Sequence, residues 1–264
     1  MRFLTTILCV LALKGYALAG EKADVPGVTN ATLVGINYFA GWWKELPNKW
    51  HGQGWNAGHP DWRPKYPERV PLLGEYNDQA TMDREIVAAA SHGVDFFAIL
   101  YYFPMPGSAE EQYAPRLNRG LESFMASKNA GKMKFCIEYC NAASFSARDE
   151  KEWNECVGTW VAAMKHPSYL RVDGRLVFKV HGVTQFLKTH NNDLALCQKR
   201  LDQLRDAVRA AGLGEMIIGT GISGQTPPLG KKWPPAEIFD FTGTYMCVPK
   251  VEPRAKDYPY SVVA

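Results

Sequence analysis

Six short apolar runs, rich in β-branched and aromatic residues, recur along the chain and are each the length of one strand. They cover residues 32–40, 94–103, 132–140, 175–182, 215–223 and 239–248. Between most of them lie segments with apolar residues at helical spacing, namely 79–93, 108–131, 148–166 and 192–214. Strands that are buried on both faces and separated by amphipathic helices build a parallel sheet. Glycines are expected to end the first helix at Gly93 and the last at Gly212 or Gly214.

A parallel sheet of this kind is either doubly wound or closed into a (β/α)8 barrel. No Gly-x-Gly-x-x-Gly or Walker sequence follows the first strand, so a nucleotide-binding open sheet loses its main support. Polar and aromatic residues fall at the carboxyl ends of successive strands, where a barrel places its active site. These residues are Tyr38, Trp42, Tyr101, Tyr102, Glu138, Tyr139, Asn141, His181 and Tyr245. We therefore predict an α/β fold of the (β/α)8 TIM-barrel type, with Asp95 and Asp240 at the opposite end of the strands.

Eight strands close such a barrel, and the pattern shows six. A six-stranded remnant would leave two unpaired strand edges. We therefore expect an incomplete barrel of about six βα units, which occupies residues 20–264 of a longer protein. The alternative is a compact six-stranded open α/β domain.

The first twenty residues indicate the cellular location of the protein. Arg2, an apolar stretch over residues 3–13 and the small-x-small sequence Ala17-Leu18-Ala19 are typical of a secretory signal peptide cleaved before Gly20. An uncleaved anchor is the alternative, although Lys14 leaves the apolar run short for a bilayer. The sequence thus predicts a secreted or periplasmic protein without a membrane span after removal of residues 1–19.

Charge and cysteine usage exclude some classes of partner. Removal of Arg2 and Lys14 leaves 28 basic against 27 acidic residues, a net charge of about +1, too small a field to hold nucleic acid. Six histidines and no Cys-x-x-Cys pair argue against a metal site, and we expect no cofactor. The odd number of remaining cysteines leaves at least one thiol without a partner in the chain, and we expect them to be buried small apolar residues: Cys136, Cys140, Cys156, Cys197 and Cys247.

A long loop, residues 42–75, follows the first strand and carries five of the eight tryptophans of the chain. Long loops without secondary structure are usually functional, and indole faces suit the apolar faces of sugar rings. Trp42 and Trp43 are the best candidates because they follow the strand end most closely. Alternatively, these rings pack against one another and form a small hydrophobic core within the loop itself.

Glu138 is the carboxylate that the pattern places at a strand end among polar neighbours, so it is the candidate catalytic residue. Positioning of a substrate, or a structural ion pair, are its alternative roles. Of Tyr101 and Tyr102 at most one should face the cavity, since neighbours in a strand alternate between faces. His181 and Asn141 are candidate partners for sugar hydroxyls, with ordinary structural roles as alternatives, and Tyr38 and Tyr245 are candidates by position alone.

Several motifs in this order resemble the glycoside hydrolase family 99-like proteins, which include endo-α-mannosidases and relatives described as polysaccharide-biosynthesis glycosyltransferases. Residues 72–103 (LLGEYNDQATMDREIVAAASHGVDFFAILYYF) resemble the second βα unit of the family, and residues 166–182 (HPSYLRVDGRLVFKVHG) its approach to the fourth strand. The segment FCIEYCN is similar to a His-Ile-Glu-Pro-Tyr segment, which matches Glu138 and Tyr139. It departs from that segment in having Cys136 for the histidine. The family's Asn-Glu-Trp-x-Glu-Gly motif, which holds its catalytic glutamates, does not occur in the chain.

The resemblance implies a (β/α)8 barrel that acts on glycosidic bonds. We therefore expect an exported glycoside hydrolase-like protein acting on oligo- or polysaccharide, with an α-mannoside as one candidate substrate. The alternatives are a non-catalytic carbohydrate-binding protein and a glycosyltransferase-like polysaccharide-assembly protein. The sugar, the linkage and the oligomeric state stay open at this point.

Overall fold

The computed structural model describes residues 32–43, 63–68, 72–73, 77–222 and 237–244. Its sheet contains six parallel strands in the order in which they occur along the chain: β1 (Gly35–Tyr38), β2 (Phe96–Tyr101), β3 (Lys134–Tyr139), β5 (Arg175–Val180), β6 (Met216–Ile222) and β7 (Phe241–Thr244). A seventh, two-residue strand, β4 (Arg171–Val172), pairs antiparallel with β5. The six predicted strands are therefore all present, whereas β4 was not predicted.

Five α-helices accompany the described strands. They are α1 (Gln79–Ser91), α2 (Ala114–Ala126), α3 (Glu150–Met164), α4 (Val183–Thr189) and α5 (Leu194–Ala210). Single 3-10 turns are η1 (Arg63–Lys65), η2 (Glu111–Tyr113), η3 (Ala130–Lys132) and η4 (Ala143–Phe145). The four helices predicted from periodicity correspond to α1, α2, α3 and α5, and the short α4 was missed. No helix in the described ranges is long and apolar enough to cross a bilayer.

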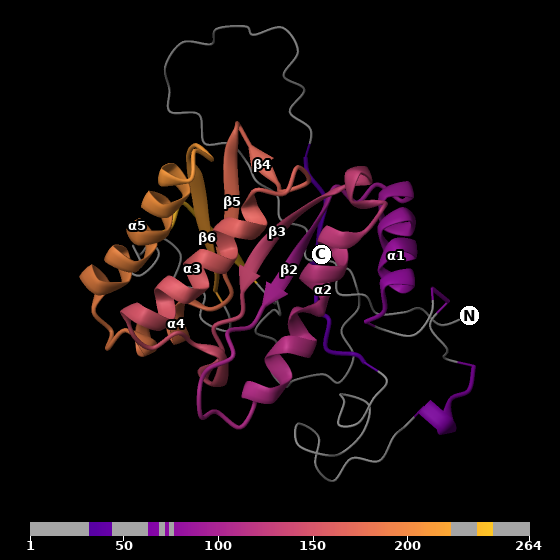
Figure 1. Cartoon of the computed structure of the whole chain (residues 1–264), viewed down its shortest axis with the longest axis horizontal. Helices are drawn as coiled ribbons and strands as arrows, with labels where there is room; N and C mark the ends of the chain where they lie inside the picture. Colours follow the sequence, from indigo (N-terminus) through magenta and orange to yellow (C-terminus); the bar gives the residue numbers. More distant parts are fainter. Residues whose placement is uncertain (1–31, 44–62, 69–71, 74–76, 223–236, 245–264) are drawn as a thin grey trace, which may run out of the picture.

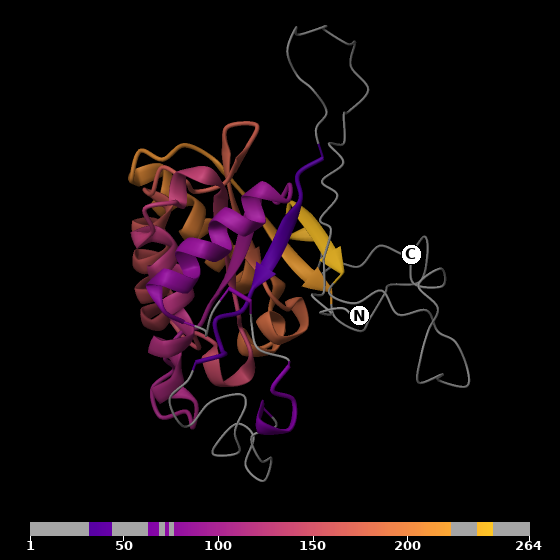
Figure 2. The same ribbon diagram turned by 90° about the vertical axis from the view of Figure 1, so that its right-hand side faces the viewer.

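The strand order decides between the two parallel architectures. Each crossover steps to the next strand in the same direction, and right-handed crossovers of that kind place every helix on the same face of the sheet. Figure 2 shows the longer helices α1, α2, α3 and α5 on one side of a curled sheet (Figures 1 and 2). The six described parallel strands thus form part of a barrel, as predicted, and not a doubly wound sheet.

The positions at which the helices begin and end are set by residues that suit the free backbone groups there. Asp78, Asp149 and Asp193 accept hydrogen bonds from the first-turn amides of α1, α3 and α5. Gly93 and Gly212 follow the last turns of α1 and α5 with φ of 81° and 70°. Glycine reaches this left-handed region without the cost that a Cβ imposes. The predicted helix stops are therefore confirmed.

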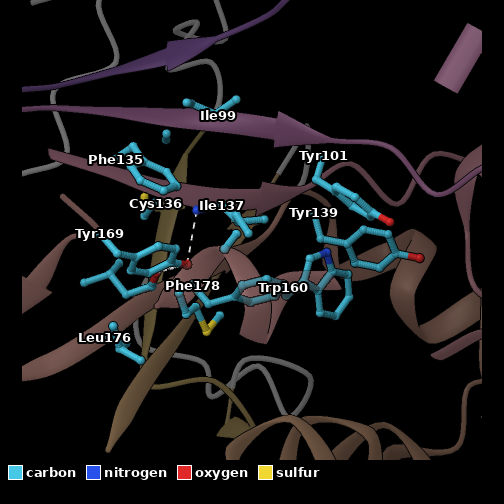
Figure 3. Close-up of a cluster of buried hydrophobic side chains, with 14 of the residues drawn as sticks. Ile99, Tyr101, Phe135, Cys136, Ile137, Tyr139, Trp160, Tyr169, Leu176 and Phe178 are labelled. Atoms are coloured by element: carbon cyan, nitrogen blue, oxygen red, sulfur yellow. Dashed lines mark hydrogen bonds between the residues drawn. The ribbon is translucent and has the colours of Figure 1, made fainter. Parts of the chain in front are cut away.

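The core lies between the sheet and the helices. Trp160 of α3 is fully buried, with its ring centroid 5.0 Å from that of Tyr139 on β3 and 4.8 Å from that of Phe178 on β5 (Figure 3). Tyr139 and Phe178 therefore point toward the helices. Because side chains alternate along a strand, the residues before and after them point to the opposite face, which we call the inner face.

The segment around Tyr169 lies between the amino-terminal halves of β3 and β5. The backbone of residues 168–170 is hydrogen-bonded to Phe135 on one side, and Leu170 accepts a bond from Val177 on the other. The Tyr169 hydroxyl accepts from the Ile137 amide at 3.3 Å and donates to the Val177 carbonyl at 2.9 Å (Figure 3). β3 and β5 pair directly only from Ile137 onward, at three residue pairs. The direct pairing is thus confined to the carboxyl ends of the two strands.

Two carboxylates bind the amino ends of neighbouring strands. Asp95 Oδ2 accepts a hydrogen bond from the Val34 amide at 2.7 Å, and Asp240 Oδ2 accepts one from the Ile218 amide at 2.7 Å. Asp95 lies at the end of the sheet away from Glu138, as predicted. Asp240 directly precedes β7, but the strand register places it beside Ile218 and level with Ile137, so the expectation holds for Asp95 and not for Asp240. Both carboxylates hold adjacent strands together.

Candidate functional site

A buried carboxylate with two basic partners occupies the carboxyl end of the sheet. Glu138 on β3 lies beside Lys179 on β5 in the register of the two strands. Lys179 Nζ is 3.1 Å from Glu138 Oε2, and His181 Nδ1 is 2.6 Å from Glu138 Oε1. The side chain of Glu138 is completely buried, that of Lys179 is 6% exposed and that of His181 is 28% exposed. His181 is therefore the member of this cluster that a ligand can reach.

The charge of Glu138 follows from this arrangement. Burial by itself raises the pKa of the carboxyl group, because the ionised form loses hydration. The hydrogen bond from His181 and the charge of Lys179 outweigh burial and hold the pKa below its ordinary value. Glu138 is thus an ionised hydrogen-bond acceptor near neutral pH, not a protonated acid.

Three backbone features fix the position of His181. Its amide donates to the Tyr139 carbonyl at 2.9 Å, which extends the pairing of β5 with β3. The Asn141 side chain accepts from the Gly182 amide at 2.9 Å and donates to the Gly182 carbonyl at 2.8 Å. A Cβ on Gly221 of β6 would lie 2.2 Å from the His181 carbonyl oxygen, so only glycine fits there. Asn141, expected as a substrate-binding residue, uses its amide to hold the loop after β5.

Three of the tyrosines expected at the site point away from it, and this corrects the expectation that they converge with Glu138. The Tyr38 hydroxyl donates to Glu85 Oε2 of α1 at 2.6 Å. Tyr101 contacts Trp160 edge to face, and the Tyr139 hydroxyl accepts from the Ala147 amide at 2.7 Å (Figure 3). All three belong to the layer between sheet and helices, on the face opposite to Glu138.

Tyr102, Trp42 and Trp43 gather instead around the carboxyl ends of β1 and β2. Tyr102 is buried against Phe145, with ring centroids 5.0 Å apart, and Trp43 is 1% exposed and stacks on Tyr113. Both are thus part of a small core, which matches the alternative reading of the tryptophans and corrects their expected contact with substrate. Trp42 is only partly buried and packs edge-on against Phe39 at 5.8 Å, so it stays a candidate for ligand contact.

Several expectations fall outside the described residues. These are the signal peptide, most of the loop 42–75, Tyr245 and Cys247. The four described cysteines, Cys136, Cys140, Cys156 and Cys197, are buried free thiols, as expected. Within the described part of the chain, no group of three or more histidine, cysteine or acidic side chains could hold a metal ion.

Lys179 is the functional-site residue that sequence reasoning missed. In the run RLVFKVHG it is a charged residue between apolar neighbours, two positions before His181 and therefore on the same face. A lysine inside a core strand needs a buried acidic partner. Glu138 is an acidic residue that the sequence places in such a strand. That signal was available, but the register that joins the two residues was not.

Comparison with known proteins gives no family model that matches the chain and no curated protein of similar sequence. Among solved structures, the chain is similar to the GH99 endo-alpha-mannosidase from Bacteroides thetaiotaomicron, with 12% sequence identity and a TM-score of 0.34. The similarity covers 58% of this chain and 56% of that enzyme. The chain thus spans little more than half of the length of that enzyme.

Proposed function

We propose that the protein binds and processes an oligo- or polysaccharide at the carboxyl end of the partial barrel, with His181 as the residue that meets the ligand. The observation that carries this proposal is the hydrogen bond between an accessible histidine and a buried, ionised glutamate at the end where barrels place their chemistry. The resemblance of residues 72–103, 135–141 and 166–182 to motifs of the family 99-like proteins supports a saccharide as the ligand.

Glu138 acts through His181 in this proposal. Both of its oxygens have partners and none of its side chain is exposed, so it does not itself reach a glycosidic oxygen. Hydrolysis of a glycosidic bond usually needs two carboxyl groups that flank the bond. Glu138 is therefore assigned a positioning role, and the acid and the base or nucleophile of a hydrolase belong to other residues.

The same observation favours a second function, saccharide binding without turnover. A site whose described carboxylate is held in an internal ion pair can recognise hydroxyl groups through His181 without cleaving the sugar. The two functions share the same ligand and differ only in whether product appears.

The test measures binding and turnover of defined saccharides by the chain. A panel of α-mannans and other polysaccharides is used for affinity electrophoresis and for detection of new reducing ends. We expect at least one polysaccharide to be bound, and His181→Ala to weaken its binding about tenfold, the loss of one good hydrogen bond. Turnover, where present, should fall on the order of 100-fold.

His92→Ala is the matched control, since His92 is exposed after α1 at the opposite end of the sheet. Release of reducing ends indicates a hydrolase, and binding alone indicates the second function. A panel without any bound polysaccharide, or equal behaviour of the two histidine variants, refutes the proposal.

Export is part of the proposal and rests on residues 1–19 of the sequence. Expression with these residues intact should yield a chain outside the cytoplasm whose first residue is Gly20. Amino-terminal sequencing of that material is the measurement, and a chain that retains Met1 would contradict it.

A further inference from the structure

His190 is a buried histidine at the carboxyl end of α4. The residue is 2% exposed, and its ring centroid lies 4.6 Å from that of Phe186 on the same helix and 6.1 Å from that of Trp153 on α3. α4 is only seven residues long, and a helix of that length is not stable by its own hydrogen bonds. The packing of its buried side chains, His190 among them, therefore holds α4 against the rest of the protein.

The hydrogen-bonding groups around the His190 ring suit its neutral form. Nδ1 lies 2.8 Å from the Phe186 carbonyl oxygen, which can only accept a hydrogen bond, so Nδ1 carries a proton. Nε2 is buried and has no hydrogen-bond partner among the described residues. A second proton, on Nε2, would create a buried N–H group without a protein acceptor, which is unfavourable. The packed ring therefore takes up that proton less readily than a ring in water.

A positive charge nearby has the same effect. Arg200 on α5 is itself buried, with 5% exposure. Burial of the ring, and after it the charge of Arg200, lower the pKa of His190 below the ordinary value of 6.5, although the bond to the Phe186 carbonyl acts in the opposite direction. Packing and charge thus both oppose protonation of the ring in the folded protein.

The other titratable groups on α3, α4 and α5 do not offset this. Glu150 on α3 is paired with the Arg200 guanidinium at 3.2 Å, and Glu152 is paired with an arginine just before α3. Asp193 accepts hydrogen bonds from the first amides of α5, and Lys188 on α4 is exposed. Burial raises the pKa of the two thiols on α3 and α5, which are therefore neutral where histidine titrates: Cys156 and Cys197.

We propose that His190 makes the attachment of α4 sensitive to acid: a second proton on its ring releases α4 from α3 and α5, while the other helices stay folded. α4 begins directly after His181 and Gly182, so the release takes place beside the candidate site. The inference goes beyond the proposed function and does not depend on it, because it concerns the protein without any ligand.

The direction of the pH effect follows from the two proton affinities. A ring released into water has the ordinary pKa of about 6.5, and the packed ring has a lower pKa. The contribution of the neutral ring to the attachment of α4 is therefore complete above about pH 6.5 and is lost as the pH falls through the lower, folded-state pKa. At pH 5.5 a ring in water is about 90% protonated, so release of α4 is favoured about tenfold more than at pH 7.5.

Hydrogen–deuterium exchange of the backbone amides of the full chain tests the proposal. Protection factors, which correct for the pH dependence of exchange in an unfolded chain, are compared at pH 7.5 and pH 5.5. The amides of Phe186 and His190 report on α4, because they donate to the carbonyls of Gly182 and Phe186. We expect their protection to fall about tenfold at the lower pH. The protection of α2, which has no histidine at either end, should stay unchanged.

His190→Asn keeps an N–H donor close to the place of Nδ1 and cannot gain a proton. In this variant α4 should be equally protected at both pH values. His92→Asn is the matched control, since His92 also follows the last turn of a helix and its Nδ1 lies 2.7 Å from the Ala88 carbonyl oxygen, but it is exposed. This control should keep the loss of protection seen in the wild type.

Three results overturn the proposal: α4 of the wild type equally protected at both pH values, an equal loss in α2, or a loss in α4 that persists in His190→Asn. An NMR titration of the wild-type His190 ring covers the case in which the variant does not fold. A midpoint below pH 6.5 supports the proposal, and a midpoint at or above that value overturns it. Absence of saccharide binding would refute the proposed function and leave this result standing.

Discussion

Removal of both partners of the Glu138–Lys179 pair should destabilise the protein by less than the sum of the two single removals. Lys179 Nζ and Glu138 Oε2 are 3.1 Å apart, with 6% and 0% of their side chains exposed. Breaking a buried pair of this kind costs about 3–5 kcal/mol, because one charge stays buried without a partner. Glu138→Gln should therefore lower the free energy of unfolding by about that amount. Lys179→Met should cost less, because Glu138 keeps its hydrogen bond to His181.

Urea unfolding, followed by tryptophan fluorescence, gives the four free energies of a double-mutant cycle. The double variant Glu138→Gln, Lys179→Met should be more stable than the sum of the single losses predicts, by about 1–3 kcal/mol. The exposed pair Lys151–Glu155, 3.9 Å apart on α3, is the control, and its variants should each cost under about 1 kcal/mol. Additive losses at Glu138 and Lys179 would refute the reasoning.

The same cycle has a predicted pH dependence. The folded protein holds the pKa of Glu138 below the ordinary value of 4.5. The stabilisation by ionised Glu138 is therefore complete above about pH 4.5 and is lost as the pH falls through the lower, folded-state pKa. The stability difference between wild type and Glu138→Gln should thus shrink below pH 4.5. A difference that stays constant down to acid unfolding would contradict this.

Three further predictions concern the surroundings of the site. Tyr169→Phe should lower the free energy of unfolding in urea by about 1–3 kcal/mol, because it leaves a buried amide and a buried carbonyl without their partner; a loss below about 0.5 kcal/mol would show that the bridge is unimportant. Gly221→Ala should displace His181, because the added Cβ has no room beside its carbonyl oxygen, and unchanged NMR shifts of the His181 ring would contradict this. The four buried thiols, Cys136, Cys140, Cys156 and Cys197, should react slowly with thiol reagents in the native chain and fast in the urea-unfolded chain. Rapid labelling of any of the four in the native chain would contradict this prediction.

The fold could be predicted further than the site, for a physical reason. Apolar runs and helical spacing reflect burial, which is a local property of each segment, so six strands and four helices were predicted correctly. The face to which a strand residue points is different, because buried parallel strands are apolar on both faces. The sequence shows that Tyr101 and Tyr102 alternate, but not which of them faces the helices.

The partner of Glu138 was missed for a related reason. Two strands of the same sheet can be paired in several registers, and each register brings a different residue of the second strand beside the first. The register of β3 and β5 depends on residues 168–170, which lie between the two strands at their amino ends. Nothing in the local pattern of either strand shows that insertion. The predicted role of Glu138 thus lacked the one neighbour that explains its charge.

The insertion at Tyr169 also gives the sheet a taper. Neighbouring strands lie about 5 Å apart, so β3 and β5 stand roughly 10 Å apart where the backbone of residues 168–170 runs between them. They close to a single spacing at Ile137, one residue before the glutamate. The two strands are closest at the end that carries His181. A change in their separation near Tyr169 would therefore alter the distances from Glu138 to Lys179 and to His181.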